Sequence, residues 1–223
     1  DDVEDARNVA NKLGIKYYVF NFEDDFENEV IERFVNAYEE GMTPNPCIDC
    51  NRYIKFKRLY QRAKELGQDY IVTGHYARVR FDEETGRYQL LKAVDKNKDQ
   101  SYVLYSITQE QLAHTIFPLG EMDDKEEVRR IAEEHGFINA RKRDSQDICF
   151  VPDGDYASFI TRYRGKEYPH GEFVDKDGEV LGEHKGIIKY TIGQRKGLGL
   201  ALKEPMYVCE KNIIDNKVIL GRN

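Results

Sequence analysis

The sequence has little that would place the protein in a membrane or outside the cell. No apolar run approaches the roughly 18 residues that a membrane-spanning helix needs, and no basic segment followed by an apolar stretch opens the chain. Cysteine is also scarce, with four in 223 residues. From these absences we predict a soluble, cytoplasmic protein without a membrane span, whose thiols serve metal binding, redox exchange or sulfur chemistry rather than structural disulfides.

Acidic residues dominate the composition, but they are unevenly spread. The formal net charge is −7, and residues 1–40 hold 12 acidic and 4 basic side chains. Two basic clusters stand out: the first comprises Arg52, Lys55, Lys57, Arg58, Arg62 and Lys64, opposed only by Glu65, and the second comprises Arg141, Lys142 and Arg143. A local basic face can bind phosphate in spite of an acidic total, and a solvated helix surface is the alternative.

Helix and strand patterns alternate over the first 150 residues. Apolar residues at helical spacing predict helices at 1–13, 26–40, 51–66 and 125–137 and one that begins near Thr108. Short apolar runs predict strands at 16–22, 69–76 and 87–94. Such alternation is typical of an α/β fold with a parallel sheet. We therefore predict an α/β domain over residues 1–160.

After Pro152 the pattern becomes mainly that of strands. A hairpin is predicted around Asp177 and Gly178, and further strands are predicted at 190–200 and 205–221, joined by Gly- and Asn-rich turns. A calcium loop at 174–180 is disfavoured because later ligands and flanking helices are lacking. This pattern predicts a small β-rich second domain over residues 161–223.

The cysteines carry the strongest chemical signal. Cys47 and Cys50 form a C-x-x-C motif at the predicted start of the basic helix, and Cys149 lies about a hundred residues away. A structural zinc site would need a second ligand pair. A thioredoxin-like site would use the helix dipole and the nearby cations to stabilise a thiolate at Cys50. A third reading joins Cys50 and Cys149, one carrying sulfane sulfur and the other resolving it beside bound RNA. Cys209, in a predicted strand, is expected to be a small buried hydrophobe.

Five segments resemble one known family in the same order along the chain. They read TPNPCIDCNRYIKF, VTGHYARV, NKDQSYVLY, RDSQDICFVPDGDYASFI and YTIGQRKGLG. Together they are similar to the bacterial tRNA-uridine 2-sulfurtransferases, also called tRNA-specific 2-thiouridylases, over nearly the whole chain. The resemblance implies a Rossmann-like domain of the ATP pyrophosphatase type, here without its first strand and glycine-rich loop. A small β-rich middle domain would follow, and the family's C-terminal β-barrel has no counterpart here.

The resemblance also implies a reaction. The family uses ATP, with magnesium as its counter-ion, to adenylate the C2 oxygen of the wobble uridine of tRNA, and a protein persulfide then supplies sulfur to C2. A cysteine desulfurase or a sulfur-relay protein would be the sulfur donor. Cys149 matches the cysteine that carries the persulfide and Cys50 the nucleophilic, resolving cysteine, and the two can form a disulfide after turnover.

Further site residues follow from the same motifs. Those matched to tRNA contacts are Asn45, Pro46, Cys47, His75, Lys98, Asp99 and Gln100, of which the first three contact the target base, and Gly74 matches an ATP-binding glycine. Some family members have Asp in place of Cys47, proposed there as a general acid or base. In this chain Cys47 or Asp49 would have to serve, or the step needs no such group. No metal ligand is implied. A non-catalytic tRNA-binding module, a thiol oxidoreductase and a zinc-stabilised module are the alternatives.

Overall fold

The computed structural model describes residues 2–142 and 147–222 and divides into two compact units. The first unit comprises Asp1–Glu29 and Cys47–Asp144, and the second comprises Val30–Pro46 and Ser145–Asn223. The chain therefore crosses between the units three times. As a result, the short segment 30–46 belongs to the same unit as the C-terminal part of the chain.

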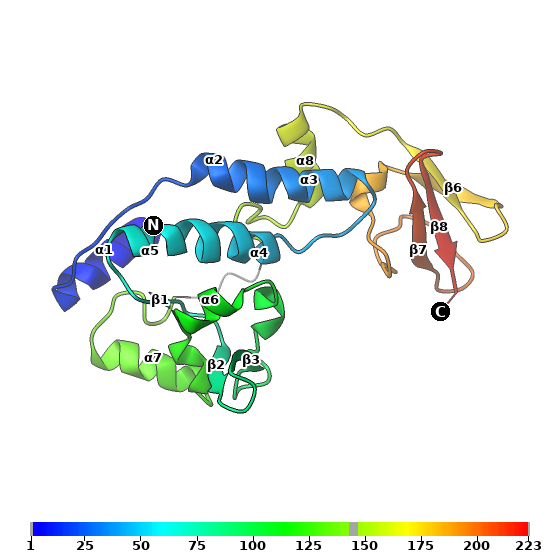
Figure 1. Ribbon diagram of the computed structural model, residues 1–223. Helices are drawn as coiled ribbons and strands as arrows, with labels where there is room; N and C mark the ends of the chain where they lie inside the picture. Colours follow the sequence, from blue (N-terminus) through cyan, green and yellow to red (C-terminus); the bar gives the residue numbers. More distant parts are fainter. Residues whose placement is uncertain (1, 143–146, 223) are drawn as a thin grey trace. The chain divides into compact units, whose positions relative to one another are not determined.

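The helices of the first unit largely follow the sequence pattern (Figure 1). They are α1 (Asp2–Leu13), α2 (Glu23–Phe26), η2 (Cys50–Leu59), α5 (Tyr60–Glu65), η3 (Ser101–Leu104), α6 (Gln109–Ala113), η4 (Pro118–Glu121) and α7 (Lys125–Glu134), while η1 (Glu27–Ile31) and α4 (Pro46–Asp49) span the unit boundaries. The predicted helices at 1–13, 51–66 and 125–137 are confirmed, and so is the one that begins near Thr108. Thr108 begins α6 with a reciprocal capping box to Gln111, which satisfies two backbone N–H groups.

The strands of the first unit form two small sheets. β1 (Ile71–Val72) pairs in parallel with β4 (Thr115–Ile116), and β2 (Ala77–Asp82) pairs antiparallel with β3 (Arg87–Lys92). The predicted strand at 69–76 is confirmed only over Ile71–Val72, and the one at 87–94 is confirmed over Arg87–Lys92. Sequence analysis missed β2, although its residues Ala77–Asp82 alternate strictly between apolar and polar side chains, as a half-buried strand does.

The predicted strand at 16–22 is wrong. Residues 15–22 form neither helix nor strand, and Tyr18 and Val19 are more than half exposed. A strand exists only where a neighbouring strand accepts its backbone hydrogen bonds, and none of the described strands pairs with this segment. An apolar run specifies strand propensity but not a partner.

The core of the first unit gathers around Phe56 of η2. Phe56 packs with Ala77, Val103, Leu104 and Phe117, all of them at most 5% exposed. This cluster joins the helix that follows Cys50 to β2 and to η3. It thereby fixes the relative positions of three segments that carry predicted site residues.

The second unit consists of one sheet and the helices packed on it (Figure 1). Its elements are α3 (Glu32–Glu39), α8 (Tyr156–Arg164), β5 (Gly171–Val174), β6 (Val180–His184), η5 (Ile187–Lys189), β7 (Tyr207–Asn212) and β8 (Lys217–Gly221), and the strand order is β6-β5-β8-β7. β5 and β8 are parallel and the other pairs are antiparallel. The predicted helix at 26–40, the hairpin at 177–178 and the strands within 205–221 are confirmed.

The predicted strand at 190–200 is wrong. Gly193, Gly197 and Gly199 have φ values of 85°, 75° and 73°. Left-handed backbone of this kind is accessible to glycine but is incompatible with a continuous strand. The segment consists of turns and irregular backbone instead.

α3 contributes to the core of the second unit although it lies far from the rest of that unit in sequence. Phe34, Val35 and Tyr38 are buried in one cluster with Ile160 of α8 and Phe173 of β5. Aromatic rings meet edge to face within this cluster, since the centroids of Phe34 and Phe150 lie 5.3 Å apart at 89°. Aromatic pairs of this geometry stabilise a core beyond their buried area.

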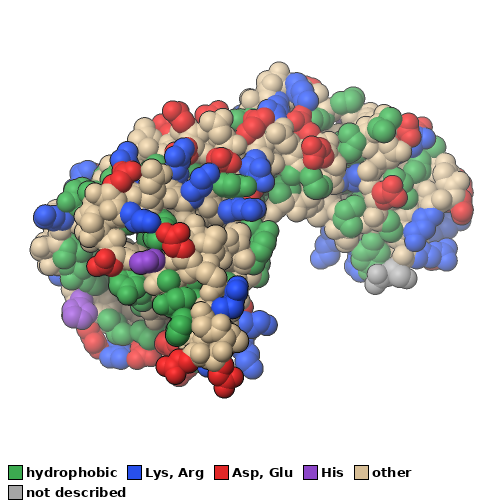
Figure 2. All heavy atoms as spheres, viewed as in Figure 1, with side chains coloured by type: hydrophobic (Ala, Val, Ile, Leu, Met, Phe, Trp, Pro, Cys, Tyr) green, Lys and Arg blue, Asp and Glu red, His purple; other side chains and the backbone are tan. Residues whose placement is uncertain are grey.

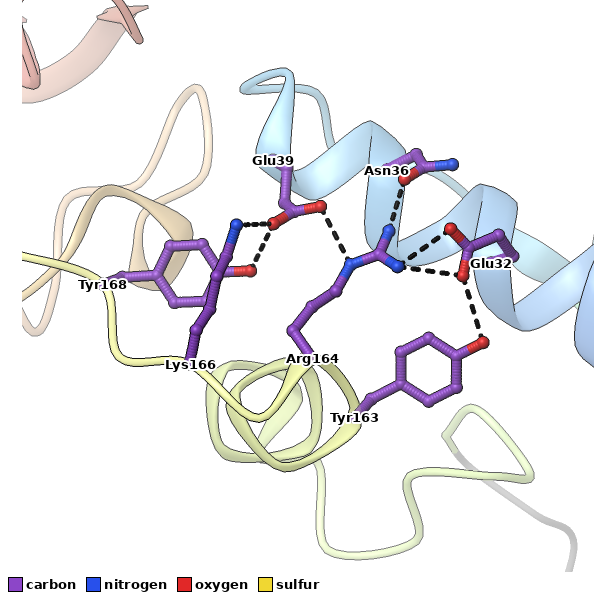
Figure 3. Close-up of polar contacts among 7 residues, drawn as sticks. All are labelled: Glu32, Asn36, Glu39, Tyr163, Arg164, Lys166 and Tyr168. Carbon is purple, nitrogen blue, oxygen red and sulfur yellow. Dashed lines mark hydrogen bonds and ion pairs between the residues drawn. The ribbon is translucent and has the colours of Figure 1, made fainter.

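A polar network reinforces the same packing (Figure 3). Its members are Glu32, Asn36, Glu39, Tyr163, Arg164, Lys166 and Tyr168. Arg164 contacts Glu32 at 2.8 Å and Glu39 at 3.0 Å, and its side chain is only 22% exposed. Burial would raise the pKa of Glu39, but hydrogen bonds from Lys166 and Tyr168 and the charge of Arg164 lower it. The network therefore ties α3 to α8 and to the segment after it.

Candidate functional site

The two cysteines of the C-x-x-C motif lie in a helix that begins before both of them. Pro46 starts α4, and the helical chain continues through η2 and α5 to Glu65. Proline suits a first helical position because its φ is already helical and its missing N–H needs no partner there. Cys47 lies in the first turn and is exposed, whereas Cys50 lies a turn later and is half-buried. The expectation that Cys50 starts the helix is wrong, and the positive end of the helix dipole lies nearer Cys47.

Asn51, directly after Cys50, anchors this turn of the helix in the first unit. The residue is 1% exposed, and its Nδ2 donates a hydrogen bond to the backbone oxygen of Val103 at 3.2 Å. Its Oδ1 is buried without a hydrogen-bond partner among the described residues. Burying an unsatisfied amide oxygen costs stability, so Asn51 is poorly explained by packing alone.

Sequence analysis missed Asn51 because of the winding of the helix. η2 is a π-helix, in which hydrogen bonds join residues five apart. Asn51 and Phe56 are five apart and equally buried. An α-helical pattern looks for partners at three or four residues and does not place these two on one face.

The segment after β1 holds Gly74 and His75. Gly74 is exposed, has no left-handed φ, and would accept a Cβ with its nearest contact 3.7 Å away at Leu119. Neither backbone strain nor packing within the unit therefore requires glycine at this position. It lies just past the carboxyl end of a parallel strand, where α/β folds bind nucleotides, and a missing side chain lets a ligand approach the backbone closely.

His75 is buried in an aromatic setting. It is 8% exposed, and its ring lies 6.2 Å from that of Phe56 and 5.9 Å from that of Phe117. Its Nδ1 lies 2.7 Å from the Thr73 hydroxyl. Burial, together with the nearby Lys55, lowers the pKa of His75 to about 4, so the imidazole is neutral at pH 7. Its part in an RNA site would be that of a neutral hydrogen-bonding group.

The segment Lys98–Gln100 is clamped beside the segment Gly74–Tyr76. The backbone N–H of Gln100 donates to the oxygen of Tyr76 at 2.8 Å, and the N–H of Tyr76 donates back to the Gln100 side chain at 3.0 Å. Asp99 accepts hydrogen bonds from the backbone of Ala93 and from Ser101. Burial would raise the pKa of Asp99, but these hydrogen bonds lower it. Asp99 therefore holds the loop in shape, while Lys98 stays exposed.

The remaining predicted site residues belong to the second unit. Asn45 is exposed and Pro46 is buried at the end of the segment 30–46. Cys149 is exposed on a turn whose neighbours are anchored: Ile148 and Phe150 pack on the core of that unit, and Val151 is 1% exposed. The structure thus groups Cys47, Cys50, Gly74, His75 and Lys98–Gln100 in one unit, and Asn45, Pro46 and Cys149 in the other.

The turn of Cys149 is also held by a polar contact. The hydroxyl of Tyr156 donates a hydrogen bond to the carboxylate of Asp147, and the backbone N–H of Ile148 donates to the same oxygen at 2.8 Å. The contact with Asp147 raises the pKa of Tyr156 to about 12 and lowers that of Asp147. The thiol is therefore presented to solvent from a fixed backbone.

The basic helix is less positive in the fold than in the sequence. Arg58 pairs with Asp25 at 2.6 Å, and Lys64 pairs with Glu110 at 3.0 Å. These acids come from other elements, so Glu65, which pairs with Arg62, is not the only acid opposing the cluster. On the face shown in Figure 2, Lys and Arg side chains are interspersed with Asp and Glu. Arg52 and Lys57 instead flank the ring of Tyr53. Cζ of Arg52 lies 5.4 Å from the ring centroid, and Nζ of Lys57 lies 5.6 Å from it.

The second basic cluster also forms ion pairs with carboxylates of the first unit. Arg141 pairs with Glu133, and Lys142 pairs with Asp2 and Asp5 at 2.5 and 2.6 Å, which raises the pKa of Lys142 to about 12. Arg143 lies outside the described residues. Arg141 thus holds the segment after α7 against that helix, and Lys142 holds the same segment against α1, so both cations serve the packing of the first unit.

Three further expectations concern metal, membrane and Cys209. Within residues 2–142 and 147–222, no group of three His, Cys, Asp or Glu side chains is arranged to hold a metal ion. Among the helices of those residues, none is long and apolar enough to cross a membrane. Cys209 was expected to be buried but is exposed on β7, where its thiol points toward the Tyr207 oxygen at 3.5 Å.

Comparison with known proteins matches two successive stretches of the chain to family models. Residues 1–153 match the model described as tRNA methyl transferase HUP domain, and residues 157–222 match the tRNA methyl transferase PRC-barrel domain. Among curated proteins, the chain is 53% identical over 221 residues to the tRNA-specific 2-thiouridylase MnmA of Clostridioides difficile, covering 99% of this chain and 61% of that protein.

Two further relatives carry the same description. The tRNA-specific 2-thiouridylase MnmA 1 of Thermoanaerobacter pseudethanolicus is 55% identical over 219 residues, covering 98% of this chain and 60% of that protein. The tRNA-specific 2-thiouridylase MnmA of Acetivibrio thermocellus is 54% identical over 219 residues, with 98% and 61% covered. The chain spans about three fifths of the length of these relatives.

Proposed function

This chain belongs to the tRNA methyl transferase family, and on that premise we propose that its protein is an ATP-dependent tRNA-uridine 2-sulfurtransferase. The family confirms the predicted fold class, a Rossmann-like domain followed by a small β-rich domain. The proposed product is 2-thiouridine at the wobble position of tRNA. The proposed sulfur source is a persulfide on Cys149.

The observation that carries the proposal is the grouping of site residues in the first unit. A hydrogen bond from Asn51 joins the turn of Cys50 to Val103 in η3. Gln100, directly before η3, is hydrogen-bonded to Tyr76, which follows Gly74 and His75. A half-buried thiol, an exposed glycine after a parallel strand and an exposed lysine thus belong to one packed framework. A nucleophile, a nucleotide-binding edge and an RNA contact are the parts that this reaction needs.

ATP fits the edge after β1. Gly74 lies there with no steric or conformational need for glycine, which is consistent with close approach of a ligand to the backbone. ATP, when bound, supplies the adenylyl group that makes the C2 oxygen of uridine a good leaving group. Magnesium is proposed as the counter-ion of the triphosphate, and we assign it no ligand among the described residues. His75, neutral at pH 7, can orient a polar group without adding charge.

Sulfur transfer then proceeds in two steps. The terminal sulfur of the Cys149 persulfide attacks C2 of the uridine, the activated oxygen departs with its electron pair, and the base is joined to Cys149 through two sulfur atoms. The Cys50 thiolate attacks Sγ of Cys149, and the bond between the two sulfurs breaks with its electron pair remaining on the transferred atom. The products are 2-thiouridine and a Cys50–Cys149 disulfide, which a cellular dithiol reduces. To expose C2, the base must leave its stack.

The exposed position of Cys149 fits loading by another protein. A cysteine desulfurase or a sulfur-relay protein must bring its own persulfide against this thiol, which requires an accessible sulfur on a fixed backbone. Ile148, Phe150 and Val151 supply that fixed backbone. We propose that loading and thiolation both occur in the cytoplasm, where tRNA and ATP are present.

Nucleoside analysis of tRNA tests the function. We expect tRNA from cells that lack the gene to have lost 2-thiouridine, and the complete gene supplied on a plasmid to restore it, measured by mass spectrometry of digested tRNA. Unchanged 2-thiouridine in the deletion strain would refute the proposed function.

A further inference from the structure

α8 carries two arginines in opposite surroundings. Arg164 is held by Glu32, Glu39 and Asn36 (Figure 3). Arg162, two residues earlier, is exposed, and no carboxylate in the described chain lies within ion-pair distance of it. Since residues two apart do not share a helix face, one face of α8 is used for packing and another is left charged.

Arg162 lines a hollow of about 330 Å³ inside the second unit. Lys185 and Lys189 line the same hollow, and neither pairs with a carboxylate among the described residues. Thr161 adds a hydroxyl, while Glu167 is the one carboxylate in the lining. His170 also contributes, paired with Glu183 at 2.7 Å outside the lining. The lining holds three cations and one carboxylate, and Asp155, in the lining of the neighbouring hollow, is a further acid close by, since the charges of Lys189 and Arg162 help to lower its pKa.

The two lysines stand on a fixed turn. Ile187 and Ile188, between them, are 7% and 2% exposed and belong to the core of the unit. Gly186 has φ 104°, and a Cβ there would lie 3.2 Å from the backbone oxygen of Tyr168, so this position favours glycine and packs closely against Tyr168. The backbone N–H of Lys185 donates to the Tyr190 hydroxyl at 3.2 Å. The core of the unit therefore holds the backbone that carries both lysines.

The hollow continues along the surface. A second hollow of about 360 Å³ shares Ala157, Ser158, Ile188 and Lys189 with the first. The lining of the second hollow also includes Asp155, so the cation that an extended phosphate backbone would meet there is Lys189. Lys189, common to both hollows, lies where successive phosphates would pass.

We propose that Arg162, Lys185 and Lys189 form a binding site for the phosphate backbone of RNA on the second unit. The proposal rests on the proposed function, because tRNA is the RNA concerned. Lys, Arg and Thr side chains are the usual partners of phosphate oxygens. An acidic protein partner is disfavoured because protein interfaces depend on buried aromatic and apolar anchors, and this lining is mostly polar. Contacts of this kind fix the position of tRNA without reading its sequence.

The test is tRNA binding by the complete protein as its gene encodes it. The variant Lys185→Ala/Lys189→Ala is compared with Lys176→Ala/Lys203→Ala, which removes the same charge from exposed lysines of the same unit that line a different hollow. We expect the first variant to bind tRNA about ten-fold more weakly near 0.15 M salt, with a salt slope smaller by about 1 to 2. The control should remain within two-fold. Adding Arg162→Ala should weaken binding further.

Activity separates this inference from the proposed function. With saturating tRNA the Lys185→Ala/Lys189→Ala variant should keep its turnover and show a raised KM for tRNA, since the site positions RNA and does not act on the base. Equal affinity and salt slope in the variant and its control, with thiolation intact, would overturn the inference alone. So would a loss of sulfur loading from the donor protein with tRNA affinity unchanged, because the surface would then bind protein. Absence of tRNA binding by the unaltered protein would overturn both.

Discussion

Cys50 and Cys149 are held in opposite ways within their units. Cys50 lies half-buried in a π-wound turn, next to an asparagine whose amide is 1% exposed. Cys149 is exposed at the surface, on a turn fixed by the apolar side chains around it. The difference matches two tasks, because a thiol that acts on a bound base needs a set position and a thiol that receives sulfur from another protein needs access.

Replacing either cysteine gives the largest expected effect. We expect Cys50→Ser and Cys149→Ser each to abolish 2-thiouridine formation, since serine cannot carry or resolve a persulfide. The two variants should differ in loading: Cys50→Ser should still acquire a persulfide at Cys149, and Cys149→Ser should not. Mass spectrometry of the protein after incubation with a cysteine desulfurase and cysteine measures loading, and nucleoside analysis measures thiolation.

Cys209→Ser is the matched control for that pair. Cys209 is equally exposed in the second unit but lies on β7, outside the five motifs. It should keep both loading and thiolation. Loading at Cys50 but not at Cys149 would reverse the two roles, and retained thiolation by either variant would remove that cysteine from the mechanism.

His75 gives the Cys50 side a measurable pH dependence. Its pKa is about 4 in the folded protein and about 6.5 in the unfolded chain. Because the folded value is the lower one, the stability that depends on neutral His75 is fully present above pH 6.5 and is lost as the pH falls toward 4. Between pH 7 and pH 5 the loss is about 2 kcal/mol. Urea unfolding of the protein and of His75→Gln at pH 7 and pH 5 measures this loss. Between the two pH values, the free energy of unfolding should fall by about 2 kcal/mol less in the variant than in the unaltered protein.

Because His75→Gln also changes packing, the two proteins are compared by how much the free energy of unfolding of each changes between pH 7 and pH 5. His184 in the second unit likewise has a lowered pKa, owing to burial, and it contributes equally to both proteins. If the free energy of unfolding changed equally with pH in the two proteins, His75 would titrate normally and be accessible to water.

The hydrogen bonds that hold the two cysteine segments can be compared directly. Asn51→Ala removes the contact with Val103 and should cost about 1 to 2 kcal/mol, with thiolation lowered about ten-fold because the turn of Cys50 shifts. Tyr156→Phe removes the contact with Asp147 at the more exposed site and should cost less than about 1 kcal/mol. Asn51→Ala should leave persulfide loading unchanged, and Tyr156→Phe should slow loading at Cys149. A loading defect in Asn51→Ala would show that Asn51 supports the whole fold rather than its own turn.

Local signals in the sequence predicted local structure well. The helix that begins near Thr108, the hairpin at Asp177 and Gly178, and the helical spacing of 125–137 each depend on residues within one element, and the structure has all three. The five motifs led to the family for a related reason, since each is a continuous segment.

Features that depend on distant partners could not be predicted. The segment 16–22 has strand propensity, but none of the described strands pairs with it. Arg58 and Lys64 form ion pairs with Asp25 and Glu110, which lie more than thirty residues away in the sequence. The contact of Arg164 with Glu32 joins residues 132 positions apart. The roles of Cys50 and Cys149 remain predictions from the motifs, because chemistry at a site is not visible in periodicity.

The smallest expected effect separates the two halves of the basic helix. Arg52 and Lys57 flank Tyr53, while Arg58 is ion-paired with Asp25 and Arg62 with Glu65. A paired cation must break its ion pair before it contacts a phosphate, so it contributes less to RNA binding. We expect Arg52→Ala/Lys57→Ala to weaken tRNA binding about five-fold and Arg58→Ala/Arg62→Ala about two-fold or less, at equal charge change, measured by filter binding over a salt series. If the second pair has the larger effect, the ion pairs open in the complex and the whole helix is the phosphate face. In that case Asp25→Asn should strengthen tRNA binding, because it releases Arg58 without removing a cation.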